Sequence, residues 1–141
     1  MPDPEPVEPE ETWEVVVVGA GPAGLSAALV LGRCGRRTLV CDSGEHRNAA
    51  AKAMRGYLGR DGTPPAEMLR IAQEEIGRYP SISMQRVTAV EAVRRDDGAF
   101  RVDLSDGRAV LASKLILATG VVDQLPSLEG LDAVWGRSAW R

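Results

Sequence analysis

Short apolar runs separated by polar, glycine-containing turns set the pattern of this 141-residue chain. The first run is four consecutive valines, Val15 to Val18, as expected for a strand buried on both faces of a parallel sheet. An apolar, alanine-rich stretch over residues 25–31 then predicts a helix, and residues 37–41 predict a second strand. The pattern therefore predicts that the chain enters its fold through a β-α-β unit.

A second helix is predicted after a long polar connection. Thr63 is suited to cap this helix and Pro64 to occupy its first position. Apolar positions between residues 68 and 76 recur at helical spacing, which favours a stripe that packs on the core. Pro80 is expected to end the helix, and residues 81–85 predict a short third strand.

Alternating apolar and polar positions dominate the next part of the chain. Two Asp-Gly pairs, which favour hairpin turns, separate runs at residues 86–95, 100–104 and 109–111. These runs predict a three-stranded antiparallel meander, and residues 114–120 predict one more buried strand that ends in glycine. The whole pattern predicts an α/β fold, with a Rossmann-like parallel sheet, its helices and an added antiparallel β-meander.

Composition and charge narrow the classes of partner. The chain has 17 basic and 20 acidic residues and a formal net charge of −3, so it shows no strong electrostatic footprint for nucleic acid. It has no run of 18 apolar residues and no basic segment leading into an apolar one. We therefore expect no membrane span, no signal peptide and a cytoplasmic location. Residues 1–12 hold four prolines and five acidic residues, which predicts a disordered tail.

The turn after the four valines has the spacing G-x-G-x-x-G, at Gly19, Gly21 and Gly24. In a dinucleotide site the first glycine makes the tight turn, the second lets the pyrophosphate approach the backbone, and the third permits close helix–strand packing. Pro22 is tolerated in the first helical turn, where its missing N–H has no intrahelical partner to lose. Strand, glycine turn and helix thus predict a dinucleotide-binding site, although such turns also join strands to helices without a ligand.

An acidic residue at the end of the second strand strengthens this prediction. A dinucleotide site places a carboxylate about 20 residues after the glycines, where it holds a ribose hydroxyl. Asp42 stands at that position. Aspartate after a strand is also a common turn former, so both interpretations remain open.

The long connection that follows carries Arg47, which is suited to pair with a phosphate, although a single arginine in a polar loop is more often merely solvated. Cys34 and Cys41 are the only cysteines, and His46 is the only histidine. Their spacing matches neither a C-x-x-C pair nor a metal site, so we expect two ordinary thiols and no catalytic residue among them.

Several of these stretches together resemble the thioredoxin-reductase-like pyridine-nucleotide:disulfide oxidoreductases. The resemblance is carried by residues 15–25, by Asp42-Ser43-Gly44 with Arg47-Asn48, by residues 56–62 and by Ala118-Thr119-Gly120. The most similar branch is that of small bacterial FAD/NAD(P)-dependent enzymes related to dithiol oxidases. The resemblance covers nearly everything after the tail.

This resemblance implies an FAD-binding domain and assigns roles along the cofactor. The residues that it places at the pyrophosphate are Gly19, Gly21, Pro22, Ala23 and Gly24. Asp42 would hold the adenosine ribose, and the backbone of Val87 would meet the adenine. Arg47 and Asn48 would lie toward the flavin, and Ala118, Thr119 and Gly120 would form the second fingerprint. For Val87 and Asn48 the alternatives, a core strand residue and a polar loop residue, stay open.

The resemblance also implies what lies beyond this sequence. Residues 13–126 correspond to the first half of an FAD-binding domain, and residues 127–141 to a truncated lead into an NAD(P)H domain. The redox-active C-x-x-C and a second G-x-G-x-x-G/A are missing from the sequence, so NAD(P)H is expected only in a full-length form. The strand ending at Gly120 is then expected to be an open sheet edge, which a second polypeptide or a homo-oligomer would cover.

The expected function is that of the FAD-binding portion of an NAD(P)H-dependent flavin oxidoreductase. In full-length relatives electrons would pass from NAD(P)H through FAD to a disulfide or another acceptor. A non-catalytic nucleotide-binding or regulatory module, using the same glycine-rich turn, is the alternative, and a remnant that only associates with other proteins is a further one. An NAD-only dehydrogenase is disfavoured, because neither Tyr57 nor Tyr79 has a lysine four residues later.

Overall fold

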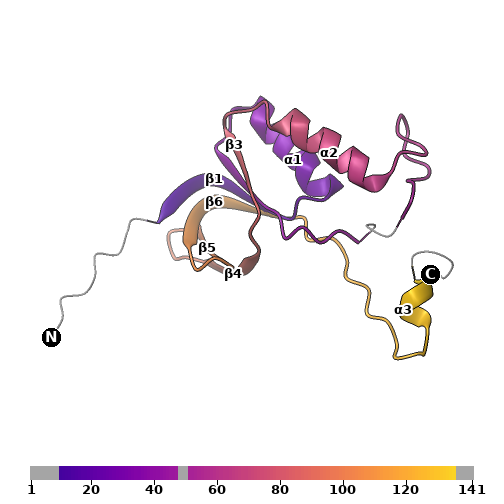
Figure 1. Cartoon of the computed structure of the whole chain (residues 1–141). Helices are drawn as coiled ribbons and strands as arrows, with labels where there is room; N and C mark the ends of the chain where they lie inside the picture. The colour runs from indigo at the N-terminus through magenta and orange to yellow at the C-terminus, as the bar shows by residue number, and fades with distance from the viewer. Residues whose placement is uncertain (1–9, 48–50, 136–141) are drawn as a thin grey trace.

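The structure, a computed structural model, describes residues 10–47 and 51–135. Asn48 and the segment from residue 136 onward, together with residues 1–9, lie outside the described residues. The described chain forms one six-stranded sheet with two long helices and one short one (Figure 1). In chain order the elements are β1 (Glu11–Val18), α1 (Pro22–Arg33), β2 (Thr38–Cys41), α2 (Pro65–Ile76), β3 (Ile82–Gln85), β4 (Ala89–Arg94), β5 (Phe100–Leu104), β6 (Ala109–Leu117) and α3 (Leu131–Val134).

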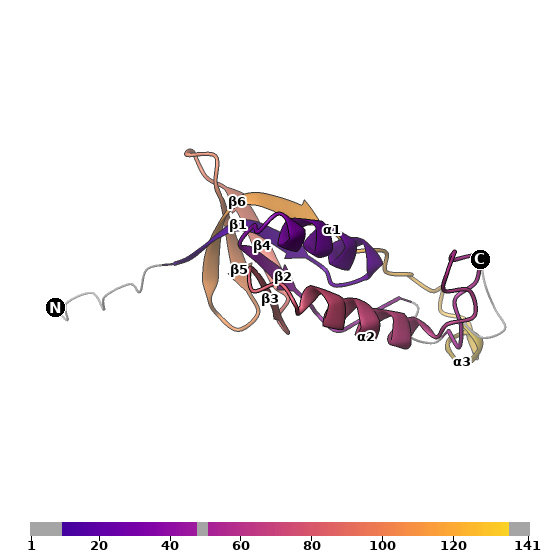
Figure 2. The same ribbon diagram turned by 90° about the horizontal axis from the view of Figure 1, so that it is seen from above.

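The sheet has the order β3-β2-β1-β6-β5-β4 and is part parallel, part antiparallel. β1 pairs in parallel with β2 on one side and with β6 on the other, and β2 pairs in parallel with β3. β4, β5 and β6 pair antiparallel. Figure 2 shows α1 and α2 side by side over the parallel strands. The predicted α/β fold, a Rossmann-like sheet with an antiparallel meander, is confirmed.

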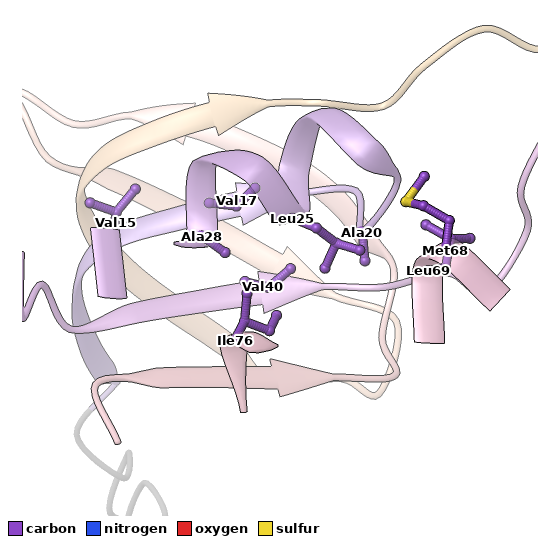
Figure 3. Close-up of a cluster of buried hydrophobic side chains, with 9 residues drawn as sticks. All are labelled: Val15, Val17, Ala20, Leu25, Ala28, Val40, Met68, Leu69 and Ile76. Atoms are coloured by element: carbon purple, nitrogen blue, oxygen red, sulfur yellow. The ribbon is translucent and has the colours of Figure 1, made fainter. Parts of the chain in front are cut away.

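Three of the four valines, Val15 to Val17, are buried and Val18 is partly buried, because β1 is covered on both faces. Val15 and Val17 pack with Val40 against α1 and α2, as Figure 3 shows for this cluster. Val16 points the other way and joins Leu39 in a second cluster, which the meander strands complete. Alternating side chains of one strand therefore serve two cores, and burying each valine stabilises the fold by about 1.5 kcal/mol or more.

Two boundaries differ from the predictions for the tail and the second helix. β1 already begins at Glu11, inside the predicted tail, because the long strand β6 gives it pairing partners at Val110 and Leu111. α2 begins at Pro65, one residue later than predicted, and ends at Ile76, well before Pro80. In the described part of the chain, no helix has both the length and the apolarity needed to cross a membrane.

The predicted break between the meander and the following strand is wrong. β6 runs without interruption from Ala109 to Leu117, so the third meander strand and the next parallel strand are one element. Residues 112 and 113 separate the two predicted strands, and the polar residues at this point, Ser113 and Lys114, are exposed residues of β6. A strand can carry such residues where one face meets solvent, so polarity alone did not mark its end.

The predicted open edge is wrong for residues 109–112 of β6 and is confirmed, among the described strands, for residues 114–117. β6 lies between β1 and β5, and the edges of the described sheet are β3 and β4. β5 pairs only with residues 109–112 of β6. On that flank the rest of β6, residues 114–117, pairs with β1 alone among the described strands.

Candidate functional site

A cleft of about 760 Å³ lies at the carboxyl ends of β1, β2 and β6. It is lined by residues 18–22, 41–43, 45–47, 87–89 and 118–123. The chain leaves β1 toward β2 on one side, and β6 returns on the other side, so the cleft lies where the strand order reverses. In open α/β sheets this crevice is where ligands bind.

The three glycines of the turn after β1 have different surroundings. Gly19 has φ +106°, and a Cβ there would lie 2.3 Å from the carbonyl oxygen of Ala118. At Gly24 a Cβ would lie 1.8 Å from the carbonyl oxygen of Gly19. At Gly21 nothing lies within 4 Å of a Cβ, and this residue lines the cleft. Two glycines are therefore needed for packing, whereas the third leaves room for something outside the chain.

The start of α1 offers unsatisfied backbone donors beside this open space. The first helical hydrogen bond runs from the Leu25 amide to the Gly21 carbonyl, at 2.9 Å. The amides of Ala23 and Gly24 precede it, and within the described chain no side chain caps the helix start. The first turn also has no acidic residue. Free amides and the helix dipole make this end of α1 suited to an anionic group.

Asp42 follows β2 directly and is buried at the cleft wall. Its Oδ1 accepts a hydrogen bond from the Gly44 amide at 2.8 Å, and its own amide donates to the Gln85 carbonyl at 2.9 Å. The Oδ2 lies 3.7 Å from Nη1 of Arg86. The turn-forming interpretation of Asp42 is therefore correct. A carboxylate that forms this turn can also face the cleft, so the turn does not exclude a binding role.

Arg47 makes an ion pair across the cleft. Its Nε and Nη2 donate to Oδ2 and Oδ1 of Asp123, at 2.8 and 3.1 Å. These hydrogen bonds raise the pKa of the Arg47 guanidinium above its ordinary value, so the group stays charged. The alternative of a merely solvated arginine is thus wrong, because a carboxylate from a distant part of the chain pairs with Arg47.

The cleft brings together most of the residues singled out in the sequence. Its lining contains Gly19, Gly21, Pro22, Asp42, Arg47, Val87, Ala118, Thr119 and Gly120. Ala23 and Gly24 belong to the first turn of α1 and are not part of this lining. Asn48 lies outside the described residues. The geometry gathers segments that are a hundred residues apart, but their contacts with a cofactor remain a prediction.

Sequence reasoning missed several residues of the lining, including Asp123, Cys41 and His46. Asp123 pairs with Arg47 although the two residues are 76 positions apart in the sequence, and no local sequence pattern predicts such a pair. Cys41 was read as an ordinary thiol; it is buried, but it also borders the cleft. His46 lines the cleft as well, and the described residues contain no cluster of side chains that would hold a metal ion.

The two thiols are expected to differ sharply in reactivity. Cys34 is exposed, whereas burial raises the pKa of the Cys41 thiol to about 11. At pH 8 a disulfide reagent such as DTNB should titrate one thiol rapidly and the second only in denaturant. A Cys34→Ser variant, as the control, should lose the rapid phase, and two rapid thiols in the native protein would contradict the burial of Cys41.

The raised pKa of the Cys41 thiol also predicts that the free energy of unfolding decreases as the pH rises from about 9 to about 11.

Comparison with known proteins agrees with this architecture. A family model described as pyridine nucleotide-disulphide oxidoreductase matches residues 13–139. A probable thioredoxin reductase of Arthroderma benhamiae is 36% identical over 140 residues, which are 96% of this chain and 35% of that protein. The thioredoxin reductase tcpT of Claviceps purpurea is 39% identical over 127 residues, or 89% of this chain and 40% of that protein.

Solved structures show the same fold. An oxidoreductase from Agrobacterium tumefaciens superposes with a TM-score of 0.84 at 41% identity, covering 89% of this chain and 42% of its own. A putative thioredoxin reductase, TrxB, from Bacillus anthracis also gives a TM-score of 0.84, at 34% identity, covering 88% and 42%. The chain thus spans about two fifths of the length of these relatives. Fold, glycine turn and family model agree, and the chain belongs to the pyridine nucleotide-disulphide oxidoreductases, a family of FAD-dependent proteins.

Proposed function

We propose that the cleft binds FAD and that the chain is the FAD-binding part of an NAD(P)H-dependent oxidoreductase. In the complete protein, electrons would pass from NAD(P)H through FAD to a disulfide or another acceptor. The observation that carries the proposal is the open space at Gly21 beside the uncapped start of α1. A diphosphate carries the charge that such a helix end favours, and Gly21 leaves room for it at the backbone.

The residues of the cleft fit the remaining parts of this cofactor. Asp42 has a fixed carboxylate at the end of β2, suited to accept hydrogen bonds from ribose hydroxyls. Val87 borders the same end of the cleft and would meet the adenine through its backbone. Arg47 and residues 118–120 would lie along the flavin side. FAD supplies the two-electron redox chemistry, and these residues bind and orient it.

The chain's own thiols do not supply the dithiol of the reaction. Cys34 follows α1 and is exposed, whereas Cys41 is buried in β2, and both are free. The proposal therefore assigns no catalytic residue to this chain.

A second polypeptide segment or a second copy along residues 114–117 of β6 would complete the sheet flank. The cytoplasmic location stays a prediction.

Titration of the whole chain with FAD tests the proposal. We expect saturable one-to-one binding of FAD, measured by the quenching of flavin fluorescence. ADP should compete only weakly, because it lacks the flavin half of FAD. Uptake of ADP without any preference for FAD would favour the alternative, a non-catalytic nucleotide-binding module. The absence of binding to either ligand would contradict both functions.

Replacing Asp42 with asparagine should weaken FAD binding about tenfold, because one charged acceptor for the ribose becomes neutral. The amide oxygen of asparagine still accepts from Gly44, so the turn should persist. Asp97→Asn is the matched control, since Asp97 accepts in the same way from the Ala99 amide at 3.0 Å but lies in a hairpin turn outside the cleft. Equal FAD affinity of the two variants would contradict the ribose role of Asp42.

A further inference from the structure

The Arg47–Asp123 pair joins two segments that no regular hydrogen-bond ladder connects. Arg47 belongs to the connection after β2, and Asp123 to the segment that leaves β6. The guanidinium engages both carboxylate oxygens, at 2.8 and 3.1 Å, and both residues line the cleft. A two-pronged contact of this kind fixes orientation as well as distance.

The surroundings of the pair favour a lasting contact over a transient surface one. The side chain of Asp123 is only 16% exposed, whereas that of Arg47 is 44% exposed. A mostly buried carboxylate needs its counter-ion, because an unpaired charge in that place is costly. In the Arg101–Asp103 pair of the meander the arginine is equally exposed, at 44%, but the carboxylate is 31% exposed, so this constraint is weaker there.

The segment after β6 needs such an anchor. The Ala118 amide donates to the Val18 carbonyl at 2.8 Å, which fixes the segment where it leaves the strand. Val121 and Val122 are exposed and so contribute little packing. Asp123 comes next, and its hydrogen bonds to Arg47 hold the end of this lining segment against the connection after β2. Figure 1 shows the segment running on from there, away from the sheet, toward α3.

We propose that Asp123 is a positioning residue, which through Arg47 ties the connection after β2 to the segment after β6 and holds the cleft in the shape that takes FAD. The inference rests on the proposed function. It opposes a second interpretation, in which Asp123 competes with the cofactor phosphates for Arg47. Arginine has five N–H donors and the pair uses two, so pairing does not exhaust Arg47. Pairing also neutralises Asp123, which would otherwise repel the diphosphate.

Measured FAD affinities distinguish positioning from competition. Asp123→Asn should raise the FAD Kd about tenfold, chiefly through a faster off-rate, because one charged hydrogen-bonded pair is lost. Competition predicts the reverse, a lower Kd. If Asp123 acts through Arg47, adding Asp123→Asn to Arg47→Gln should cause no further loss of affinity, and it should recover part of the loss because the unpaired charge is removed. Asp103→Asn removes a charge of the same sign from an exposed pair outside the cleft and should leave the Kd unchanged.

A readout without ligand separates this proposal from the function on which it rests. A guanidinium held by Asp123 enters the specificity pocket of trypsin poorly, so cleavage after Arg47 should be several-fold faster in Asp123→Asn than in the wild type. Cleavage after Arg60, which is exposed in the same connection, is the internal control. If the wild type fails to bind FAD, the proposed function is wrong, and faster cleavage after Arg47 alone would still establish the tie. An unchanged cleavage rate, additive losses in the double variant, or an equal or lower Kd in Asp123→Asn overturns the positioning role.

Discussion

Replacing Gly21 with valine should reduce FAD affinity by about 100-fold or more while leaving the fold intact. Gly21 has φ −75° and ψ −176°, a backbone conformation that any residue adopts. A Cβ there meets no atom of the chain within 4 Å. The added side chain therefore costs the folded protein little. The valine side chain would occupy the space through which the diphosphate would approach the start of α1. The substitution should therefore reduce the affinity for FAD rather than the stability of the fold.

Two measurements check this expectation together. The FAD Kd should rise in the order glycine, alanine, valine at position 21, whereas the Tm should stay within a few degrees across the series. An unchanged Kd in Gly21→Val would place the cofactor elsewhere and remove the main support for the proposed function. A protein that only associates with other proteins would keep that association in the same variant.

The predictions from sequence succeed where the signal is local. The valine run, the glycine turn and the first helix lie within twenty residues, and each residue type there is dictated by its own backbone position. Val15 and Val17 face the helices and Val16 faces the meander, which is the two-sided burial that an unbroken apolar run indicates.

The predictions fail where distant segments decide the outcome. The sequence predicts two strands separated at residues 112 and 113, whereas β1 pairs along β6 from Val110 to Leu117. β6 also pairs with β5 over residues 109–112, so the predicted open edge is confined to residues 114–117. The Arg47–Asp123 pair depends on two chain segments meeting above the same strand ends, and neither residue has a neighbour that signals it. Contacts between segments so far apart in the chain produce no local sequence pattern from which they could be predicted.

Gly24→Ala should have the opposite effect to a substitution at Gly21, lowering the stability of the fold itself. Alanine is favoured over glycine within a helix by about 1 kcal/mol, so propensity alone predicts a more stable protein. At this position, however, the Cβ would lie 1.8 Å from the carbonyl oxygen of Gly19, and backbone atoms yield only by moving α1 away from β1. We expect the clash to outweigh the propensity and to lower the free energy of unfolding by about 2 kcal/mol.

Urea denaturation followed by circular dichroism measures this loss. The urea midpoint should fall in Gly24→Ala with an unchanged m-value. In the control variant Gly21→Ala, which changes another glycine of the same motif, the free energy of unfolding should stay within about 0.5 kcal/mol of the wild-type value. Gly24→Ala would then bind FAD weakly because the helix start has shifted, whereas Gly21→Val would do so with the helix in place. Should Gly24→Ala prove as stable as the wild type, the close contact between α1 and the turn after β1 is wrong. In that case the third glycine of the motif has no packing role in this chain.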